Sequence, residues 1–191
     1  MGAEADPTGL THLDATGSAR MVDVGGKDVS DRTAVARATL SMRPDTARAL
    51  ADGTLPKGDA LPVARLAGIM AAKKTPELIP LCHTVALASV DVAVEVDAGA
   101  GRAVILATAR AADRTGVEME ALVAASTAAL ALYDMVKAIE RGVVIERVEL
   151  VSKAGGVHGD WQRDATGTSD APDAPDAPDA PDALDAPGGS S

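Results

Sequence analysis

The sequence predicts an α+β domain in which helices pack on one face of an antiparallel sheet. Three observations support this fold class. Several runs rich in valine and alanine alternate in polarity, two of these runs are joined by a short glycine-containing turn, and the longest apolar stretch repeats at helical spacing. The expected order of elements along the chain is roughly β-α-α-β-β-α-β.

The expected elements follow one another closely along the chain. Strands are expected over residues 32–42, 85–97, 102–113 and 143–153, after a short extended piece that begins at residue 19 and stops at Gly25-Gly26. Helices are expected over residues 43–53, 58–74 and 116–141. The two middle strands should form a hairpin, because Gly99 and Gly101 lie in the short segment between them.

The expected helix ends carry residues that are typical of helix boundaries. Pro44 lies in the first turn of the first helix, and Gly53 lies just past its end. Asp59 is suited to cap the second helix, where Pro62 is tolerated in the first turn. Gly142 closes the long third helix.

Composition divides the chain of 191 residues into three parts. We expect a flexible N-terminus over residues 1–18, an α+β domain over 19–161 that carries the candidate catalytic residues, and a disordered acidic tail of Asp-Ala-Pro repeats over 162–191. The formal net charge is −10, but residues 164–191 hold seven aspartates without Lys or Arg, so only −3 belongs to the rest. The folded part lacks the basic surplus of nucleic-acid binders, and no nucleic-acid partner is expected.

The aromatic and cysteine content and the length of the uncharged stretches predict the assembly and the cellular compartment of the protein. The chain has no Phe, one Tyr and one Trp, so its core side chains bury less area than aromatic ones, and we expect an oligomer. Cys82 is the only cysteine, which excludes an intramolecular disulfide and a cysteine-rich zinc site. The longest uncharged stretch, residues 121–133, falls short of the roughly 18 residues of a membrane span. No signal peptide is visible, so a cytoplasmic protein without membrane contact is expected.

The segment TGVEMEAL places two acids at the expected start of the long helix. Thr115 and Glu118 match a capping box, in which the Glu118 carboxylate accepts a hydrogen bond from the Thr115 N–H. Acids in the first turn also suit the helix dipole. Glu120 lies beyond the capping position, so capping explains it less well and a binding role stays open.

An acid and a base stand at the other end of the same helix. Asp134 and Lys137 are three residues apart and share a face. One interpretation is a surface ion pair that contributes little energy. The other is an acid–base couple, because lysine transfers protons where burial or nearby cations lower its pKa, and the apolar residues around the pair predict partial burial.

The two ends of this helix cannot serve one small-molecule site within a single chain. Glu120 and Asp134 are 14 residues apart, which is about 21 Å at 1.5 Å per residue. Either the two residues act in different sites, or a second subunit brings the opposite end of its own helix alongside.

Lysines elsewhere are candidates for binding an anion. Lys57 precedes a helix start, where free N–H groups favour anions, although a solvated loop lysine is the ordinary alternative. Lys153 precedes two glycines whose backbone can hold a phosphate, but no P-loop motif is present. Lys73 and Lys74 can simply complement a helix C-terminus.

The string ELIPLCHT contains the remaining candidates. Cys82 and His83 would point to opposite sides of an extended segment. No second Cys or His stands at ligand spacing, so a metal site is not expected. A lone histidine is usually structural, but one in a loop near lysines can also donate to a phosphate oxygen.

Four longer stretches together resemble the cyclic pyranopterin monophosphate synthase family of molybdenum cofactor biosynthesis, the MoaC family. They are LTHLDATGSARMVDV, KGDALPVARLAGIMAAKKTPELIPLCH, TGVEMEALVAASTAALALYDMVKAIE and LVSKAGG. The resemblance covers about residues 10–161, with the motifs in order. It implies a ferredoxin-like fold and a homohexamer of three dimers, with the sites at the dimer interfaces.

The resemblance also implies an activity and a set of site residues. The family comprises phosphorus–oxygen lyases that convert (8S)-3',8-cyclo-7,8-dihydroguanosine 5'-triphosphate, made by a radical SAM enzyme, to cyclic pyranopterin monophosphate and diphosphate. No cofactor is required, and Mg²⁺ can accompany the triphosphate. The implied catalytic residues are Lys57, Lys137 and Asp134. The implied substrate-binding residues are Leu81, Cys82, His83, Met119, Glu120, Glu118, Lys73 and Lys153.

One alternative function stays open at this point. A non-catalytic hexamer could bind the pterin precursor or act as a scaffold for its pathway. The intact Lys57, Asp134 and Lys137 argue against this alternative. A weaker hypothesis is that the acidic tail recruits a basic partner.

Overall fold

The computed structural model describes residues 16–157 and 159–164. The described residues from Asp23 onward belong to one compact unit, and residues 16–22 belong to another. Most of the predicted flexible N-terminus and of the predicted acidic tail, residues 1–15 and 165–191, lies outside the described residues.

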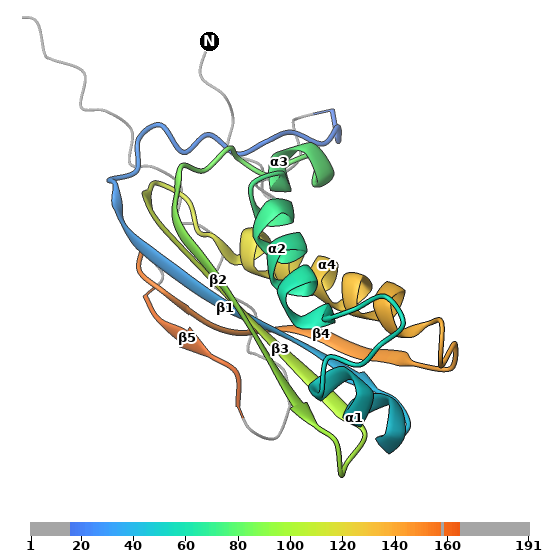
Figure 1. The fold of residues 1–191 in the computed structure, drawn as a ribbon. Helices are drawn as coiled ribbons and strands as arrows, with labels where there is room; N and C mark the ends of the chain where they lie inside the picture. The colour runs from blue at the N-terminus through green and yellow to red at the C-terminus, as the bar shows by residue number, and fades with distance from the viewer. Residues whose placement is uncertain (1–15, 158, 165–191) are drawn as a thin grey trace, which may run out of the picture. The chain divides into compact units, whose positions relative to one another are not determined.

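The described chain forms an open sheet with helices packed on one face (Figure 1). The strands are β1 (Ser30–Ser41), β2 (Leu87–Asp97), β3 (Arg102–Asp113), β4 (Val144–Ala154) and β5 (Trp161–Gln162). The helices are α1 (Pro44–Ala51), α2 (Ala60–Ala72), α3 (Thr75–Leu78) and α4 (Glu118–Val136). The sheet order is β2-β3-β1-β4-β5 and every pairing is antiparallel, which confirms the predicted α+β, ferredoxin-like class.

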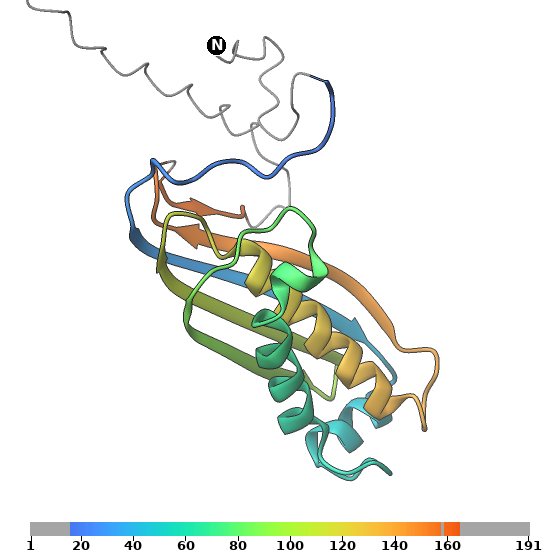
Figure 2. The ribbon, with the colours of Figure 1, turned by 90° about the horizontal axis from the view of Figure 1, so that it is seen from above.

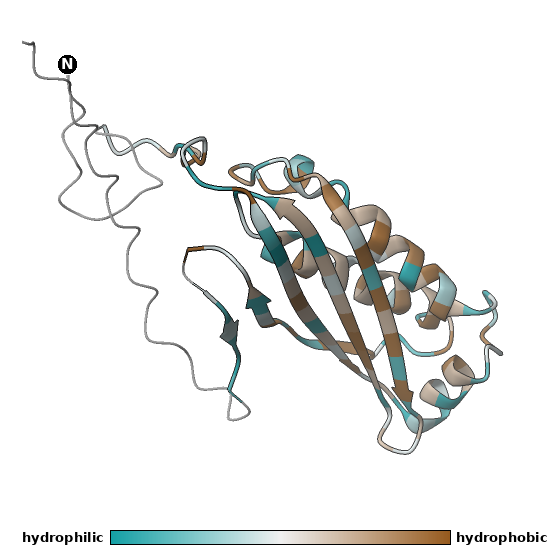
Figure 3. Ribbon diagram, turned by 90° about the vertical axis from the view of Figure 1, so that its left-hand side faces the viewer, coloured by the Kyte–Doolittle hydropathy of each residue, from teal (hydrophilic) through white to brown (hydrophobic). Residues whose placement is uncertain are grey.

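Alternation along the strands separates the two faces of the sheet. Ala34, Ala36, Ala38 and Leu40 on β1 are fully buried beneath α4, and the residues between them face the other side. Figure 2 shows α2 and α4 on the same side of the sheet. The opposite face alternates hydrophilic and hydrophobic residues, and no described helix covers it (Figure 3).

Small residues let the two long helices approach each other closely. A Cβ added at Gly68 of α2 would lie 2.8 Å from the Ala124 carbonyl oxygen of α4. Five alanines of α4, at positions 121, 124, 125, 128 and 129, are fully buried. This packing brings the loop before α2 to the C-terminal end of α4, where the first group of candidate residues lies.

Helix α4 is the central helix of the core. It is the one helix of the described residues that has the length and composition of a membrane span, and 56% of that stretch is buried inside the fold. Its burial against β1, β3 and α2 accounts for its apolar composition without a membrane.

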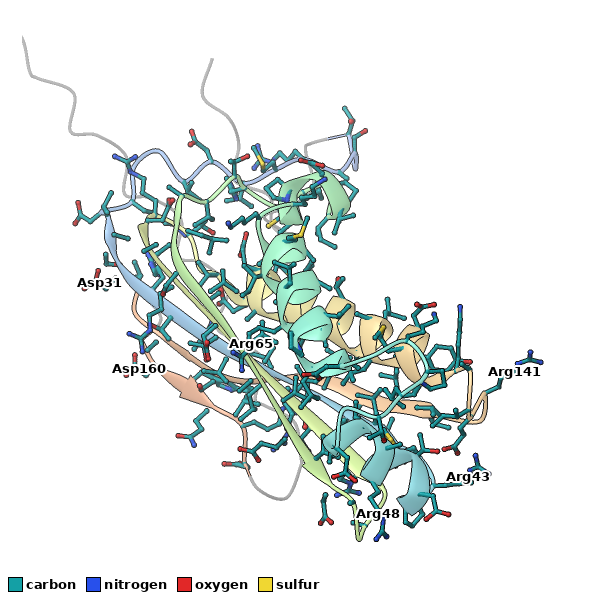
Figure 4. All side chains as sticks on the ribbon, in the orientation of Figure 1. Asp31, Arg43, Arg48, Arg65, Arg141 and Asp160 are labelled. Atoms are coloured by element: carbon teal, nitrogen blue, oxygen red, sulfur yellow. The ribbon has the colours of Figure 1, made fainter. Side chains whose placement is uncertain are left out.

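Helix α4 begins two residues later and ends five residues earlier than the predicted 116–141. Beyond Val136 the chain turns, because the Arg43 guanidinium donates to the Ile139 carbonyl at 3.0 Å and the Tyr133 hydroxyl donates to the Arg141 carbonyl at 3.1 Å. Arg43 and Arg141 lie at this end of the molecule (Figure 4). The contact of Arg43, which joins residues 96 positions apart, cannot be read from helical periodicity.

Residues 19–24 contain a single bridge residue at Ala19 and lead into a turn at Gly25 and Gly26, where the predicted extended piece was expected to stop. Two further differences concern short elements. Helix α3 and strand β5 were not predicted, since four and two residues are too short to show a period.

Candidate active site

The first group of candidate residues lies at the C-terminal end of α4. Lys57 stands in the loop before α2, whose start is capped by Asp59 as predicted: the Asp59 carboxylate accepts from the Leu61 N–H at 3.1 Å. Lys57 Nζ donates to Asp134 Oδ2 at 2.7 Å and to the Asp134 carbonyl at 2.8 Å. Lys137 Nζ contacts Asp134 Oδ1 at 2.6 Å. We call Lys57, Asp134 and Lys137 the lysine cluster.

The electrostatics of the lysine cluster fix its charge. Hydrogen bonds from Lys137 and Lys57 lower the pKa of Asp134 to about 2. The same carboxylate raises the pKa of Lys137. At neutral pH the cluster therefore holds an ionised Asp134 and a protonated Lys137, a state suited to binding an anion and to donating a proton.

The predicted partial burial of this pair is wrong for the single chain. The side chains of Lys57, Asp134 and Lys137 are 39%, 53% and 49% exposed. Leu130, one of the apolar neighbours on which the prediction rested, is itself 59% exposed. The Asp134 carboxylate raises the pKa of Lys137 by its hydrogen bond and its charge, and this outweighs the lowering by burial.

The second group lies at the other end of α4, which we call the acidic end. Glu118, Met119 and Glu120 form the first turn, and Cys82 contacts Glu120 from the segment between α3 and β2. Lys153 reaches across from β4 to Glu118, with 3.6 Å between Nζ and Oε1.

The predicted capping box at the start of α4 is wrong. The N-cap is Val117, it makes no side-chain cap bond, and Glu118 is already the first helical residue. The Glu118 side chain folds back over Gly116, at a position where a Cβ on that glycine would collide with the carboxylate. Lys153 holds the carboxylate there, so Glu118 serves an ion pair instead of capping Thr115.

Glu120 differs sharply from Glu118 in its surroundings. It is 1% exposed, and its Oε2 has no hydrogen-bond partner among the described residues. Burial raises the pKa of Glu120, and the nearby Glu118 and Asp113 raise it further. A hydrogen bond from its own backbone N–H partly offsets this rise. Burial, together with Glu120 and Glu118, also raises the pKa of the Cys82 thiol.

The sequence analysis missed a buried cation near the acidic end. Arg32 on β1 is 9% exposed, and its guanidinium donates to the carbonyls of Asp113 and Arg114 at 3.2 and 3.3 Å. Gly155 and Gly156 pass directly over this side chain with φ of 92° and 90°. A usable signal was present, because Arg32 occupies a core-facing position of the strand, in register with Ala34 and Ala36.

The turn that covers Arg32 is held by a side chain from the segment that follows it. The Asp160 carboxylate accepts from the Gly155 N–H at 3.0 Å. Figure 4 labels Asp31, near the start of the central strand β1, and Asp160, just before β5.

The remaining predicted residues lie around the acidic end. Lys73 is the exposed C-cap of α2, as expected for a cation that complements the helix dipole. Leu81 is 38% exposed, and His83 is half-buried in the same segment as Cys82. No three His, Cys, Asp or Glu side chains of the described residues group as they would around a metal ion.

One chain therefore holds two separate groups of candidate residues, which we call half-sites. The lysine cluster and the acidic end stand at opposite ends of α4, about 21 Å apart along the helix axis. Each half-site is assembled by long-range contacts within the chain, and the two are not brought together by the fold.

Comparison with known proteins identifies the family. A model of the MoaC family matches residues 21–156. The chain belongs to the MoaC family. Both half-sites lie within the matched residues.

MoaC-family relatives are similar to this chain over most of its length. A cyclic pyranopterin monophosphate synthase of Pelotomaculum thermopropionicum is 55% identical over 156 residues, which cover 82% of this chain and 92% of the relative. A protein of the same name from Roseiflexus castenholzii is 57% identical over 151 residues, covering 79% and 96%. One from Chloroflexus aurantiacus is 55% identical over 154 residues, covering 81% and 94%.

Proposed function

We propose that this chain is a cyclic pyranopterin monophosphate synthase, a lyase of molybdenum cofactor biosynthesis. It converts (8S)-3',8-cyclo-7,8-dihydroguanosine 5'-triphosphate to cyclic pyranopterin monophosphate and diphosphate. Family membership and the names of relatives at about 55% identity support this activity. The structural observation that carries it is the direct contact of both lysines, Lys57 and Lys137, with the one carboxylate of Asp134.

The lysine cluster suits a reaction on a triphosphate. Two ammonium groups held by one carboxylate leave a net positive charge that attracts phosphate oxygens. When a substrate hydroxyl attacks the innermost phosphorus, a new P–O bond closes the cyclic phosphate and diphosphate leaves. The raised pKa of Lys137 makes it a proton donor in the free site, and once deprotonated it can accept the next proton.

The acidic end suits the ring of the substrate. A glutamate accepts hydrogen bonds from the N–H donors of a guanine-like ring, and Glu120 is the acid placed for this role. Lys153, Lys73 and the buried Arg32 add cations at the same end. In this assignment Leu81, His83 and Met119 complete the walls around the ring, and Cys82 stands at its entrance.

A complete site needs two copies of the chain. Two α4 helices packed antiparallel across a two-fold axis would place the lysine cluster of one copy beside the acidic end of the other, and would form two equivalent sites. Exposed apolar side chains support a contact through the helix layer: Val63, Leu66 and Met70 on α2 and Leu130 on α4 are 45–59% exposed. Three such dimers would form the homohexamer.

The substrate comes from another enzyme, and a metal ion can accompany it. A radical SAM enzyme supplies the cyclised substrate, and both proteins work in the cytoplasm. Mg²⁺ can accompany the triphosphate as part of the substrate, since phosphates with one or two carboxylates are its usual ligands.

Turnover of the cyclised dihydro-GTP, followed by diphosphate release, tests the activity. Wild type should turn over, Lys57→Ala and Lys137→Ala should not, and Lys74→Ala, an exposed lysine outside both half-sites, should match wild type. Folded wild type without turnover that still binds the compound would replace this proposal with the non-catalytic binding protein.

Co-expression of two inactive variants tests the shared site. Lys137→Ala and Glu118→Ala affect different half-sites, so random mixed dimers should recover about a quarter of wild-type turnover through the site that pairs two intact halves. Lys57→Ala with Lys137→Ala should recover nothing, because both lysines belong to the same half-site. Recovery in the second pair alone would contradict the arrangement.

A further inference from the structure

Glu120 is closed off in this structure although it is the acid assigned to the substrate ring. Its side chain is 1% exposed, and Oε2 lies in the interior without a partner among the described residues. A buried carboxyl oxygen without a hydrogen bond is unfavourable and rare in folded proteins. A group in this condition is either a defect of packing or one partner of an interaction that a ligand completes.

Cys82 forms the part of the cover that touches the carboxyl. The thiol lies 4.0 Å from Glu120 Oε1, the far limit of a hydrogen bond to sulfur. Cys82 belongs to an irregular segment between α3 and β2, held locally by a turn in which its N–H donates to the Ile79 carbonyl at 3.0 Å. Because a thiol is a weak donor and the contact is long, little free energy is lost when this segment moves away.

The charges around Glu120 favour its neutral form while the cover is closed. Glu118 on the same helix turn and Asp113 at the end of β3 are both acidic and raise its pKa. Glu120 makes no ion pair with any described residue. The positive groups nearest this end are directed elsewhere, Lys153 to Glu118 and Arg32 to backbone carbonyls.

His83 is the remaining titratable neighbour on the covering segment. It is half-buried and adjacent to Cys82 in the sequence. Among the described residues, the groups that act on Glu120 are the Cys82 thiol and the carboxylates of Glu118 and Asp113.

We propose that Cys82 is a latch over Glu120, and that a ligand with paired N–H donors opens it in exchange for the Glu120 proton. In the free protein the thiol covers a neutral carboxylic acid. When such a ligand binds, the Cys82 segment moves aside, both carboxylate oxygens accept N–H bonds, and the acid proton leaves to solvent. No covalent bond other than the O–H bond of Glu120 breaks.

The latch rests on the proposed function and adds one detail to it, the edge of the substrate ring that Glu120 recognises. A guanine-like ring presents two adjacent N–H donors, which match the two oxygens of an ionised carboxylate, whereas an adenine ring lacks this pair. The exchange therefore makes recognition of the ring proton-linked, and turnover is not needed to observe it.

Proton release on binding is the decisive measurement. Calorimetric titration of the full-length protein with GTP, repeated in buffers of different ionisation enthalpy, should show release of up to about one proton per site, with the largest value below the pKa of Glu120 in the free protein. Glu120→Gln has no proton to lose and should release none, and ATP, with the same triphosphate, should release none in wild type. Equal proton release by wild type and Glu120→Gln would overturn the proposal.

A second measurement tests the cover itself, and the single cysteine makes it specific. The alkylation rate of Cys82 by iodoacetamide should rise with pH more steeply in wild type than in Glu120→Gln, because ionisation of Glu120 opens the latch as well. Glu118→Gln removes a neighbouring charge that raises the pKa of both Cys82 and Glu120 but leaves the Glu120 proton in place, so it should keep the wild-type excess over Glu120→Gln, moved to lower pH. Parallel profiles for wild type and Glu120→Gln would overturn the latch.

The cover can also be removed while the carboxyl is kept. Cys82→Ala alters a partly exposed segment outside the helices and strands, so the fold is retained. It should bind GTP severalfold more tightly than wild type and still release the proton. Weaker binding would show that the thiol supports the ligand and does not cover the site. Proton release with GTP by a protein that lacks turnover would leave the latch standing and reject only the lyase.

Discussion

The two ends of helix α4 place their acidic side chains in opposite environments. At the C-terminal end, Asp134 is 53% exposed and bonded to two lysines, which lower its pKa to about 2. At the N-terminal end, Glu120 is 1% exposed, forms no ion pair with a described residue and has a raised pKa. The first group is exposed and ionised, whereas the second is buried and its pKa is shifted in favour of the neutral form.

The difference follows from where each residue sits relative to the sheet. Asp134 lies on the outward side of the last turn, where water and two flexible lysines compete to solvate it. Glu120 is on the inward side of the first turn, beneath the Cys82 segment. One helix thus carries an exposed, ion-paired carboxylate at one end and, at the other, a buried carboxyl whose Oε2 has no hydrogen-bond partner among the described residues.

The largest expected effect comes from removing a charge at the open end. Lys137→Ala should lower kcat by about 10²–10⁴-fold, the usual contribution of a positioned proton donor. Lys137→Arg keeps the positive charge but cannot give up its proton, so it should retain substrate binding with a kcat near that of Lys137→Ala. The measurement is steady-state diphosphate release. A Lys137→Arg variant with wild-type kcat would show that charge alone matters at this end.

The next effect concerns the backbone that supports the closed end. Gly155→Ala should destabilise the fold by about 2–3 kcal/mol, because its φ of 92° is unfavourable for alanine and the added Cβ would collide with the Asp31 carbonyl. Gly159→Ala is the matched control, since its φ is 70° but no atom lies within 4 Å of the added Cβ. It should be destabilised by about 1 kcal/mol. Urea unfolding measures the loss of stability in both variants. Equal losses would mean that the close approach of the added Cβ to the Asp31 carbonyl contributes nothing.

The fold was predictable because its signals are local and repeated. The alternation of alanines on β1 with Val35 and Arg37, the two glycines of the β2–β3 turn and Asp59 at the start of α2 each specify structure within a few residues. The half-site residues come from the family resemblance, and their roles stay predictions. The C-terminal end of α4 was not predictable, because Arg43, which is distant in the sequence, contacts the chain just beyond the helix.

The environment of each candidate residue was harder to predict than its identity. Glu118 and Glu120 stand two residues apart and look alike in the sequence, yet one pairs with Lys153 and the other is sealed under Cys82. Periodicity alone does not show which side of a first turn faces the interior. Arg32 could have been identified from the sequence, because strand periodicity places this charged residue at a core-facing position of β1.

A smaller effect tests the neutral state of the closed end through stability. The raised pKa of Glu120 means that the folded state keeps its proton when the unfolded chain loses it, above about pH 4.3. Stability from this group is full below that pH and falls as pH rises towards the folded pKa, by about 1.4 kcal/mol per pH unit. Glu120→Gln should lack this decline. Thermal melts of both proteins from pH 4 to pH 7 measure it, and parallel curves would indicate that Glu120 is ionised in the free protein.

The smallest effect returns to the open end and concerns Asp59, which caps α2 two residues after Lys57. Asp59→Ala should cost about 1 kcal/mol of stability, because the Leu61 N–H loses its acceptor. Asp59→Asn keeps an acceptor oxygen and should recover most of that loss. Since the cap sets the path of the loop that carries Lys57, Asp59→Ala should raise KM more than it lowers kcat, whereas the closed end should be unaffected and Cys82 should alkylate at the wild-type rate. A changed Cys82 rate would mean that the two ends of α4 are coupled through α2, and the comparison between an independent open end and an independent closed end would have to be abandoned.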